Sequence, residues 1–548
     1  MKKLLSLLLC AALLAGCGSS TVTEVTAEST APTEAGPSRT LPVPEYDVPD
    51  YVSRFDTVTG ITFSDNGITI DGSTGTDAVF TSHDIVYYED RDAYDSGNPY
   101  GEGTGADKHT AEEAAAHTVV NITQPGAYRV TGKLSAGQIR IDLGDEAYEN
   151  PDAVVELILD NADITCTVAP AILFLNTYEC DGNWSKDSAT PHVDTTSAGA
   201  NLILEGENTV SGSYVAKIFK DKDGEKKLWK QDGAIYSYMS MNVFGPGSLD
   251  LTAANEGMDT ELHLTLNGGN IRIFSDNDGI NTNAHGVSVT TINDGSLTIF
   301  AGLGAEGDGI DSNGYLVVNG GIVIAAANPA ADAGLDSDLG SFINGGTVIA
   351  LGSTMDWAES ESGQVTLNLQ FAGQQQPGSR IQVLAEDGTE IFSFTPEGEH
   401  SRSFSGVILS SPVLSRGETC HIYIDGVQMT YTGTDVGRGP EGMHPGPMPE
   451  NLDPGNLPEG FDPAKMENHG RHSGDNGVPP EGFDGEIPTI PAELERPEPP
   501  EGETFPEGKP PQGGFGGHGQ YSVPSGESST EFYMNDMVNS FSGVTAVQ

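Results

Sequence analysis

Acidic side chains recur in a short phrase that the sequence repeats four times between residues 256 and 346. Each phrase combines a glycine, an apolar residue and an Asp or Asn, and it leads into an apolar run and a glycine turn. The phrases are Glu256-Gly257-Met258-Asp259-Thr260, Asp278-Gly279-Ile280-Asn281-Thr282, Asp308-Gly309-Ile310-Asp311-Ser312 and Gly334-Leu335-Asp336-Ser337. Carboxylate and amide oxygens are the ligands that calcium prefers, in shells of about six to eight oxygens.

Stacking of the repeats would bring these oxygens together. If successive phrases lie about 4.8 Å apart like neighbouring strands, they form two columns, Asp259, Asn281, Asp311 and Asp336 in one and Glu256, Asp278 and Asp308 in the other. Carboxylates at that spacing repel one another unless they share a cation or hydrogen bonds. The sequence therefore predicts bound calcium, with Asp276, Glu306 and Asp338 available to complete the coordination shells. The alternative is that Asp and Asn at these corners only cap exposed backbone amides.

The elements that position these residues are predicted to be short strands joined by tight turns. Runs such as Ile271-Arg272-Ile273 and Ile322-Val323-Ile324 are typical of strands, and Asn-Gly pairs supply the positive φ of a sharp corner. The turn asparagines Asn267, Asn293, Asn319 and Asn344 recur at intervals of 26, 26 and 25 residues. Such a period indicates units that bury their apolar faces by stacking. We therefore predict an all-β parallel β-helix over residues 49–355, interrupted by loop insertions.

Groups that could catalyse polysaccharide cleavage are scarce in the repeats. β-Elimination from a uronate needs a base, in lyases of this fold typically Arg or Lys, beside a metal. Between Gln231 and Ser353 the only basic side chain other than histidine is Arg272, whose place in mid-strand favours exposure to solvent. Hydrolysis needs paired carboxylates, which are abundant, but the polygalacturonase-type set of Asn-Thr-Asp, Asp-Asp, Gly-His-Gly and Arg-x-Lys is absent. A non-catalytic function is expected.

The N-terminal segment is typical of an exported lipoprotein. Lys2-Lys3 precede an apolar run, and Leu14-Ala15-Gly16-Cys17 resembles a bacterial lipobox, so residues 1–17 are predicted to be a signal peptide and Cys17 the lipidated residue. An ordinary secretory signal is the alternative. Residues 18–48 have the composition of a flexible tether. We expect an extracytoplasmic protein that is anchored by lipid to the outer face of a bacterial cell membrane.

The period ends after Ser353, and the composition then changes twice. Residues 356–436 contain strands and turns that predict a small antiparallel β-module capping the solenoid. Residues 437–525 are rich in Pro, Gly and Glu and are predicted to be disordered, whereas residues 526–548 turn apolar again, which would allow the tail to pack back on the cap. The basic insertion 217–230 has no assigned role.

The charge balance restricts the partners. The formal net charge is 25 − 80 = −55, which excludes nucleic acid as a natural partner and would repel an anionic surface without a bridging cation. Aromatic side chains that could stack on neutral sugars are sparse in the repeats. A monomer that contacts the membrane only through its lipid anchor is expected.

An ordered set of segments resembles a family of secreted bacterial carbohydrate-binding proteins with a right-handed, single-stranded parallel β-helix similar to pectate lyases. The set spans roughly residues 58–432 and comprises Gly126-Ala127-Tyr128-Arg129-Val130-Thr131-Gly132, Pro170-Ala171-Ile172, Phe244-Gly245-Pro246-Gly247-Ser248-Leu249, the four acidic phrases with their turns, and Ser410-Ser411-Pro412-Val413-Leu414 followed by Gly417. The expanded repeat 278–307 departs from the family pattern. The resemblance implies binding of plant-type polysaccharides, including acidic sugars, with calcium.

We therefore expect a surface protein that binds polysaccharide without cleaving it, with calcium as a structural ion or as a bridge to uronates. A calcium-dependent lyase or hydrolase is one alternative, and an adhesin or scaffold with a protein partner is another.

Overall fold

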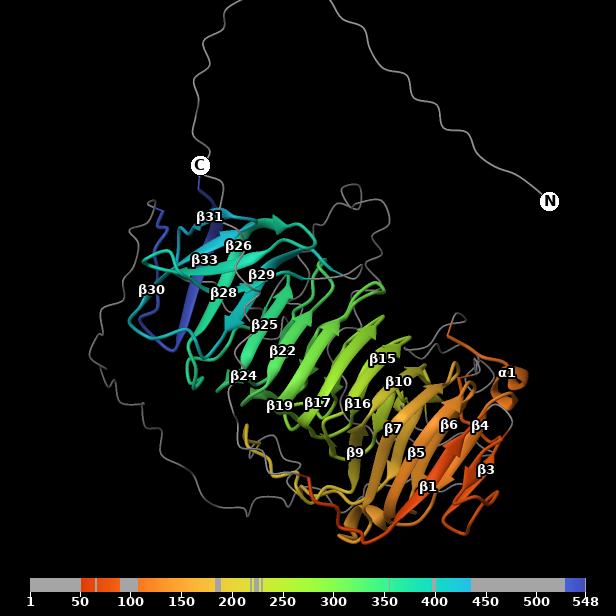
Figure 1. Ribbon diagram of the computed structural model, residues 1–548. Coiled ribbons are helices and arrows are strands. Elements are labelled where there is room, and N and C mark those ends of the chain that lie inside the picture. Colours follow the sequence, from red (N-terminus) through yellow and green to blue (C-terminus); the bar gives the residue numbers. More distant parts are fainter. Residues whose placement is uncertain are drawn as a thin grey trace, which may run out of the picture. The chain divides into compact units, whose positions relative to one another are not determined.

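A computed structural model describes residues 51–64, 67–88, 107–182, 189–216, 219–220, 226–227, 230–353, 355–396, 401–434 and 528–547 (Figure 1). These residues belong to one compact unit that starts at Leu41. The lipidation residue Cys17, the tether 18–48 and the Pro-rich segment 437–525 lie outside the described residues, as does most of the insertion 217–230. Within the described part of the chain, no helix is long and apolar enough to cross a membrane.

The described fold is all-β, as the sequence predicts. Its helical elements are α1 (Ala111–Ala115) and a 3₁₀ turn, η2 (Ala147–Glu149). Strands from successive repeats pair in parallel and lie side by side along the structure (Figure 1). These parallel pairings form three stacks, and most repeats contribute one strand segment to each stack.

The first of these, here called the acidic stack, consists of short strands. It contains β4 (Thr118–Ile122), β6 (Gly137–Asp142), β8 (Ile172–Asn176), β13 (Gly233–Ser237), β16 (Glu256–Thr260), β18 (Ile280–Thr282), β20 (Ile310–Ser312) and β23 (Leu335–Ser337), and β3 (Val79–Ser82) pairs antiparallel with β4. The other two stacks share long strands that bend at the glycine turns and so belong to both.

These are the middle stack and the outer stack. The middle stack contains the first parts of β5 (Gly126–Leu134), β7 (Val155–Thr165), β17 (Leu264–Ser275) and β19 (Val289–Phe300), together with β9 (Ala200–Glu205), β14 (Met241–Phe244), β21 (Tyr315–Val318) and β24 (Gly340–Ile343). The outer stack contains the second parts of the long strands with β10 (Glu207–Gly212), β15 (Ser248–Ala253), β22 (Ile322–Ala326) and β25 (Thr347–Gly352). β1 (Val58–Phe63) pairs parallel with β5, and β2 (Thr69–Ile70) pairs antiparallel with β1. Separately, β11 (Phe219–Lys220) pairs antiparallel with β12 (Lys226–Lys227).

The glycine turns are held together by a ladder of asparagine side chains. Each Asn Nδ2 donates to the Oδ1 of the preceding one, from Asn293 to Asn267 at 2.8 Å, from Asn319 to Asn293 at 2.9 Å and from Asn344 to Asn319 at 3.0 Å. Gly269, which follows the first of these asparagines, has a φ of 92° that a side chain would strain. The period of the turn asparagines therefore has a direct structural cause.

Apolar side chains from the three stacks meet in one continuous core. Ile, Leu and Val residues dominate it, and members such as Ile273, Ile280 and Ile310 are fully buried. Burial of this kind stabilises the chain by about 25 cal/mol per Å² of apolar surface, so each repeat depends on its neighbours to cover its apolar face.

After β25 the strands pair mainly antiparallel around a second core. They are β26 (Thr366–Gln375), β27 (Ile381–Ala385), β28 (Glu390–Phe394), β29 (Phe404–Ser410), β30 (Thr419–Ile424) and β31 (Val427–Thr430). β29 pairs antiparallel with β25, which continues the outer stack into this module. From the tail, β32 (Phe532–Tyr533) pairs with β30, and β33 (Val538–Ala546) pairs with β26 and β31.

Candidate metal centre

The acidic stack brings the predicted column of oxygen ligands into register. Asp259 pairs with Asn281, Asn281 with Asp311, and Asp311 with Asp336 on adjacent parallel strands. The residue before each of them, Met258, Ile280, Ile310 or Leu335, is fully buried in the core. Because successive side chains in a strand alternate between faces, the column lies on the face of the acidic stack that points away from the core.

The glycine of each phrase is required by close packing at the start of the strand. A Cβ at Gly257 would lie 2.4 Å from the carbonyl oxygen of Gly279 and 2.5 Å from Cγ2 of Ile273. The same conflict recurs at Gly279, where a Cβ would lie 2.2 Å from Cγ2 of Ile299. Close packing therefore requires glycine at these positions.

The second predicted column serves partly to cap the backbone. Oδ1 of Asp278 accepts the backbone N–H of Asp308 at 2.6 Å, and Oδ1 of Asp308 accepts that of Ala333 at 2.5 Å. Oε1 of Glu256 accepts Nδ2 of Asn281 at 3.2 Å. At least one carboxylate oxygen of Asp278 and of Asp308 therefore caps a backbone N–H, as the alternative to a calcium ligand predicts.

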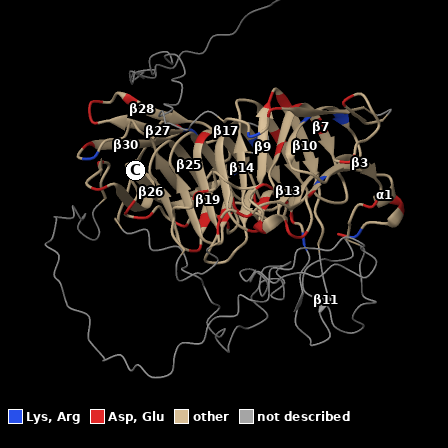
Figure 2. Cartoon of the chain, turned by 90° about the horizontal axis from the view of Figure 1, so that it is seen from below, with Lys and Arg blue, Asp and Glu red and all other residues tan. Residues whose placement is uncertain are grey.

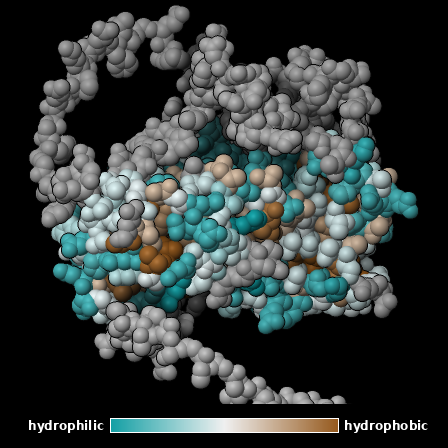
Figure 3. All heavy atoms as spheres, turned by 90° about the horizontal axis from the view of Figure 1, so that it is seen from above, coloured by the Kyte–Doolittle hydropathy of each residue, from teal (hydrophilic) through white to brown (hydrophobic). Residues whose placement is uncertain are grey.

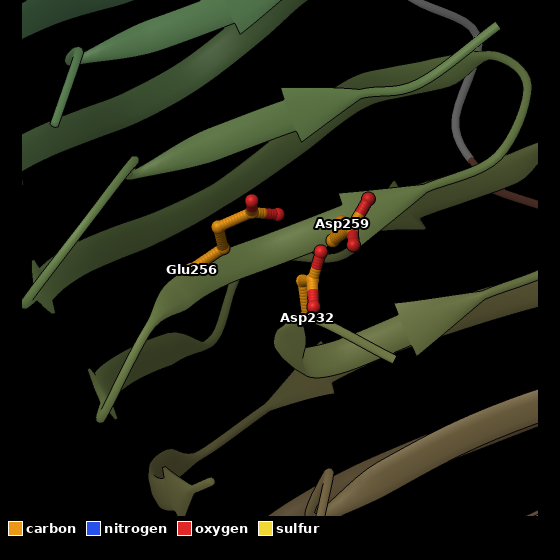
Figure 4. Close-up of side chains that lie close together, drawn as sticks. All are labelled: Asp232, Glu256 and Asp259. Atoms are coloured by element: carbon orange, nitrogen blue, oxygen red, sulfur yellow. The ribbon is translucent and has the colours of Figure 1, made fainter. Parts of the chain in front are cut away.

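Three carboxylates converge where the two columns meet. One oxygen each from Asp232, Glu256 and Asp259 lies within 4.8 Å of the other two. Figure 4 shows Glu256 and Asp259 on the same strand, β16, with Asp232 just before β13 facing Asp259. Oxygens bound to one calcium ion at about 2.3–2.6 Å are separated by no more than roughly twice that distance, so the three groups fit a calcium ion.

Part of this cluster has no hydrogen-bond donor. Glu256 is 4 % exposed and Asp259 is 0 % exposed, yet Oε2 of Glu256 and Oδ2 of Asp259 receive no hydrogen bond from an N–H or O–H group of the described chain. Oδ1 of the buried Asn283 is also unpaired, while its Nδ2 donates to Asp259 at 2.8 Å. Buried polar atoms are rarely left unsatisfied, so these oxygens suit a bound cation, a proton shared between Glu256 and Asp259, or a bound water.

Burial and mutual repulsion make these carboxyl groups weak acids. Burial, followed by the charge of Asp232, raises the pKa of Glu256 from 4.5 to about 7. Burial and then the charge of Glu256 raise the pKa of Asp259 well above its ordinary value. Burial raises the pKa of Asp278, Asp308 and Asp311 in the same way, with neighbouring carboxylates adding to the effect. A divalent cation would reverse these shifts because it favours the charged form.

Two residues of the site, Asp232 and Lys230, were missed from the sequence. Lys230 is 8 % exposed and its Nζ donates to Oδ2 of Asp232. Burial alone would lower the pKa of Lys230, but the charges of Asp232, Glu256 and Asp259 outweigh burial and raise it well above its ordinary value. Asp232-Gly233 repeats the acid-glycine pairing of the later phrases, and that signal could have revealed Asp232. Lys230 lies directly before the stretch from Gln231 to Ser353, in which Arg272 is the only Lys or Arg.

Other predicted ligands lie apart from the cluster. Asp276 and Glu306 are exposed. Asp338 is also exposed and pairs with Nδ1 of His285, and Asp336 accepts the backbone N–H of Ser337 at 3.0 Å. Arg272 is 51 % exposed and lies 3.7 Å from Asp250 on the outer stack, as the sequence favoured.

A small polar pocket is lined by residues that follow β8 and β18 of the acidic stack. It has a volume of 230 Å³ and is lined by residues that include Cys180, Asp181, His192 and Asp194. Buried His263 lies behind it. Its Nδ1 accepts the N–H of Val289 at 3.0 Å, so Nε2 carries the proton and donates to Asp181 at 3.1 Å. These contacts fix the orientation of one pocket carboxylate.

The surface surrounding the described strands is mixed in polarity. Figure 3 shows small hydrophobic patches separated by hydrophilic residues on the face seen from above. Figure 2 shows acidic positions along the edge between the labels β19 and β13, with few basic positions among them. Such a surface suits a hydroxyl-rich or charged ligand better than an apolar one.

Residues 116–370 match the family described as carbohydrate-binding domain-containing protein. A protein of that description from Acetivibrio thermocellus is 27 % identical over 155 residues, which cover 28 % of this chain and 44 % of the relative. Among solved structures, one described as the polysaccharide lyase-like protein from C. thermocellum, gadolinium derivative, is 20 % identical and covers 53 % of this chain and 94 % of its own, with a TM-score of 0.29. The chain is therefore similar over less than half of its length to proteins described as carrying a carbohydrate-binding domain.

Proposed function

We propose that the chain binds polysaccharide without cleaving it, on the outer face of the acidic stack, with calcium held by Asp232, Glu256 and Asp259. The observation that carries the proposal is the convergence of these carboxylates, two of them with buried oxygens that lack a donor. The similarity of residues 116–370 to a carbohydrate-binding family supports a polysaccharide as the ligand. When bound, calcium would neutralise the cluster. Because Glu256 and Asp259 are buried, carboxylate or hydroxyl oxygens of a ligand would reach the ion at the side of Asp232, which is 14 % exposed.

We propose an acidic, uronate-containing or other plant-type glycan as the polysaccharide. With a net charge of −55, the chain would repel a polyanion unless a cation lay between them. Calcium can serve as this bridge, or it can act as a structural ion that orders the face. The column of Asn281, Asp311 and Asp336 extends from the cluster along the stack, and its length suits a chain of sugar units better than a single one.

Finer features of the fold and location complete the proposal. The three parallel stacks support a right-handed parallel β-helix similar to that of pectate lyases. The lipobox-like segment ending at Cys17 supports a lipid-anchored monomer on the outer face of a bacterial cell membrane. A Cys17→Ala variant is expected to lose metabolic lipid labelling and to leave the membrane fraction.

Affinity electrophoresis tests the main proposal. The full chain is run through gels that contain polygalacturonate, a neutral plant polysaccharide or no polysaccharide, each with calcium or with a chelator. Retardation by polygalacturonate in calcium, lost in chelator and in Asp259→Asn, is the expected result. Absence of retardation by every polysaccharide in calcium, together with empty glycan arrays, would contradict the proposal. Capture of a defined surface protein alongside such negative results would favour an adhesin.

A calcium-dependent lyase is the second candidate, because Lys230 places a basic group in the cluster. Against it, Lys230 is buried and its ammonium donates to Asp232, whereas a general base must be free to accept a proton. Incubation with polygalacturonate and calcium distinguishes the two functions. The binding proposal expects no rise in absorbance from unsaturated uronate, and a rise that disappears in Lys230→Met would establish the lyase.

A further inference from the structure

The ammonium group of Lys230 offsets part of the negative charge of the cluster, as a bound metal ion would. Its Nζ donates to Asp232, and Glu256 and Asp259 are the next charges that act on it. Asp232 is one of the carboxylates that converge for a cation. The ammonium group and a divalent ion would therefore use the same carboxylate at the same place.

The charges in the cluster do not balance with Lys230 alone. The carboxylates of Asp232, Glu256 and Asp259 would carry three negative charges when ionised, and Lys230 supplies one positive charge. At least two negative charges are left, and the neighbouring carboxylate of Glu261, which also acts on Asp259, adds to this excess. A divalent cation offsets such an excess better than the lysine alone does. A monovalent ion would offer no more charge than the lysine and would forgo the advantage of a tethered group.

An ammonium group and calcium also repel each other at this spacing. Lysine can only donate hydrogen bonds and cannot coordinate a metal in its protonated form. Around a partly buried site the effective dielectric constant is far below that of water, so the repulsion is strong. Binding of calcium to Asp232 must therefore displace the Lys230 ammonium from it.

We propose that Lys230 is an internal competitor that lowers the calcium affinity of this site and favours divalent over monovalent cations. The proposal rests on the proposed function in one respect, the binding of calcium to Asp232, Glu256 and Asp259. It explains why a lysine is buried among the acids of a candidate calcium site. The competing ammonium raises the calcium concentration that is needed to occupy the site.

Titration calorimetry of the full chain with calcium alone tests the proposal, with Lys230→Met compared with wild type. Methionine keeps an unbranched apolar stem without the charge, so calcium is expected to bind at least about tenfold more tightly in the variant. Lys133→Met is the matched control, because Lys133 is 54 % exposed and pairs with Asp163 on the long strands β5 and β7. The control is expected to bind calcium as wild type does.

Chemical labelling of the wild-type chain gives a second readout that no folding defect can obscure. Lys230 is expected to resist an amine-acetylating reagent in chelator and to become reactive in calcium, as followed by peptide mass spectrometry. Equal calcium affinity in wild type and Lys230→Met, or continued protection of Lys230 in calcium, would overturn the competitor role while leaving the calcium site in place. Absence of calcium binding in every variant would instead overturn the site itself and the inference with it.

Discussion

Two acidic regions of the molecule neutralise their charges in different ways. On the middle stack, Arg129 binds Asp160 at 2.8 Å and also pairs with Glu205, and nearby Lys133 pairs with Asp163 at 2.5 Å. On the acidic stack, Asp232, Glu256 and Asp259 converge with Lys230 as the described basic group among them. In the first region, here called the balanced region, each of these carboxylates contacts a basic side chain. In the second, the unbalanced region, Asp232 alone of the three contacts the lysine among the described residues.

The comparison shows why acidic side chains alone are a poor guide to a metal site. Asp160 and Glu205 are partly exposed and meet a guanidinium group in ordinary surface ion pairs. Hydrogen bonding to Glu205 raises the pKa of Arg129, so this group remains charged. Glu256 and Asp259 are buried and retain oxygens without donors. A missing internal partner, rather than acidity, distinguishes the candidate site.

The largest expected effect comes from neutralising the unbalanced region. In a Glu256→Gln/Asp259→Asn double variant, calcium is expected to lose nearly all of its stabilising effect, because two of three carboxylate ligands are gone. The calcium-free variant should be more stable than calcium-free wild type, since buried repulsion is relieved. Thermal unfolding with calcium and with chelator measures both changes.

The balanced region supplies the control for that experiment. An Asp160→Asn/Glu205→Gln variant should keep its calcium response and lose stability, the opposite pattern in both respects. If the two double variants respond to calcium equally, the contrast between the regions has no functional meaning.

The stability of the fold should also depend on pH, because Glu256 ionises within the same buried cluster. Its pKa in the folded chain is raised from 4.5 to about 7, so the native state binds more protons than the unfolded state between these values. Without metal, this group should therefore stabilise the fold fully below about pH 4.5 and lose that contribution as the pH rises through about 7, an effect of at most roughly 3–4 kcal/mol. Urea unfolding of wild type and Glu256→Gln in chelator measures this contribution together with the effect of Glu256 on Asp259.

The difference in unfolding free energy between these two proteins should change with pH in one direction only. Wild type should lose stability relative to Glu256→Gln between pH 5 and 8 in chelator. Calcium should restore wild type more at pH 8 than at pH 5, because metal ligands must be deprotonated. If the unfolding free energy of wild type instead rises relative to that of Glu256→Gln as the pH rises in chelator, Glu256 is ionised and already paired.

A smaller effect is expected from removing the basic side chain that pairs with Asp160 and Glu205 in the balanced region. Arg129 is 33 % exposed, and surface ion pairs contribute roughly 0.5–1 kcal/mol. Arg129→Met should therefore lower the unfolding free energy by about that amount and leave calcium binding unchanged. Calorimetric titration and urea unfolding on the same sample check both expectations. A tenfold change in calcium affinity would mean that the two acidic regions are coupled.

Most of the structural predictions that the sequence allows, including the register of the acidic residues, come from the repeat pattern. The nearly equal spacing of the turn asparagines and the shared order of residues in the phrases imply equal register, and Asp259, Asn281, Asp311 and Asp336 do pair across adjacent strands. What spacing cannot show is which oxygens already have donors. Backbone N–H groups satisfy oxygens of Asp278 and Asp308, and nothing in the phrases separates these residues from Glu256.

The missed residues lie where the pattern breaks. Lys230 is the last residue of the insertion 217–230 and Asp232 follows it closely, so both precede the first clear phrase and fall outside its period. Their approach to Asp259 depends on the pairing of β13 with β16. A search for isolated Asp-Gly pairs one repeat upstream would have found Asp232, but only the fold reveals that the adjacent lysine turns into the cluster.

The smallest expected effect separates the ligands chosen from sequence from those that the structure favours. Asp338 lies beyond the end of β23, is 40 % exposed and pairs with His285. An Asp338→Asn variant should bind calcium with wild-type affinity and change stability by no more than about 0.5 kcal/mol, because an exposed pair contributes little. Asp259→Asn, measured in the same titration, should lose at least about tenfold in affinity, since a bound carboxylate is replaced by a neutral amide. If Asp338→Asn proves the more damaging change, the cation lies farther along the column toward β23, and the cluster at β16 holds shared protons instead.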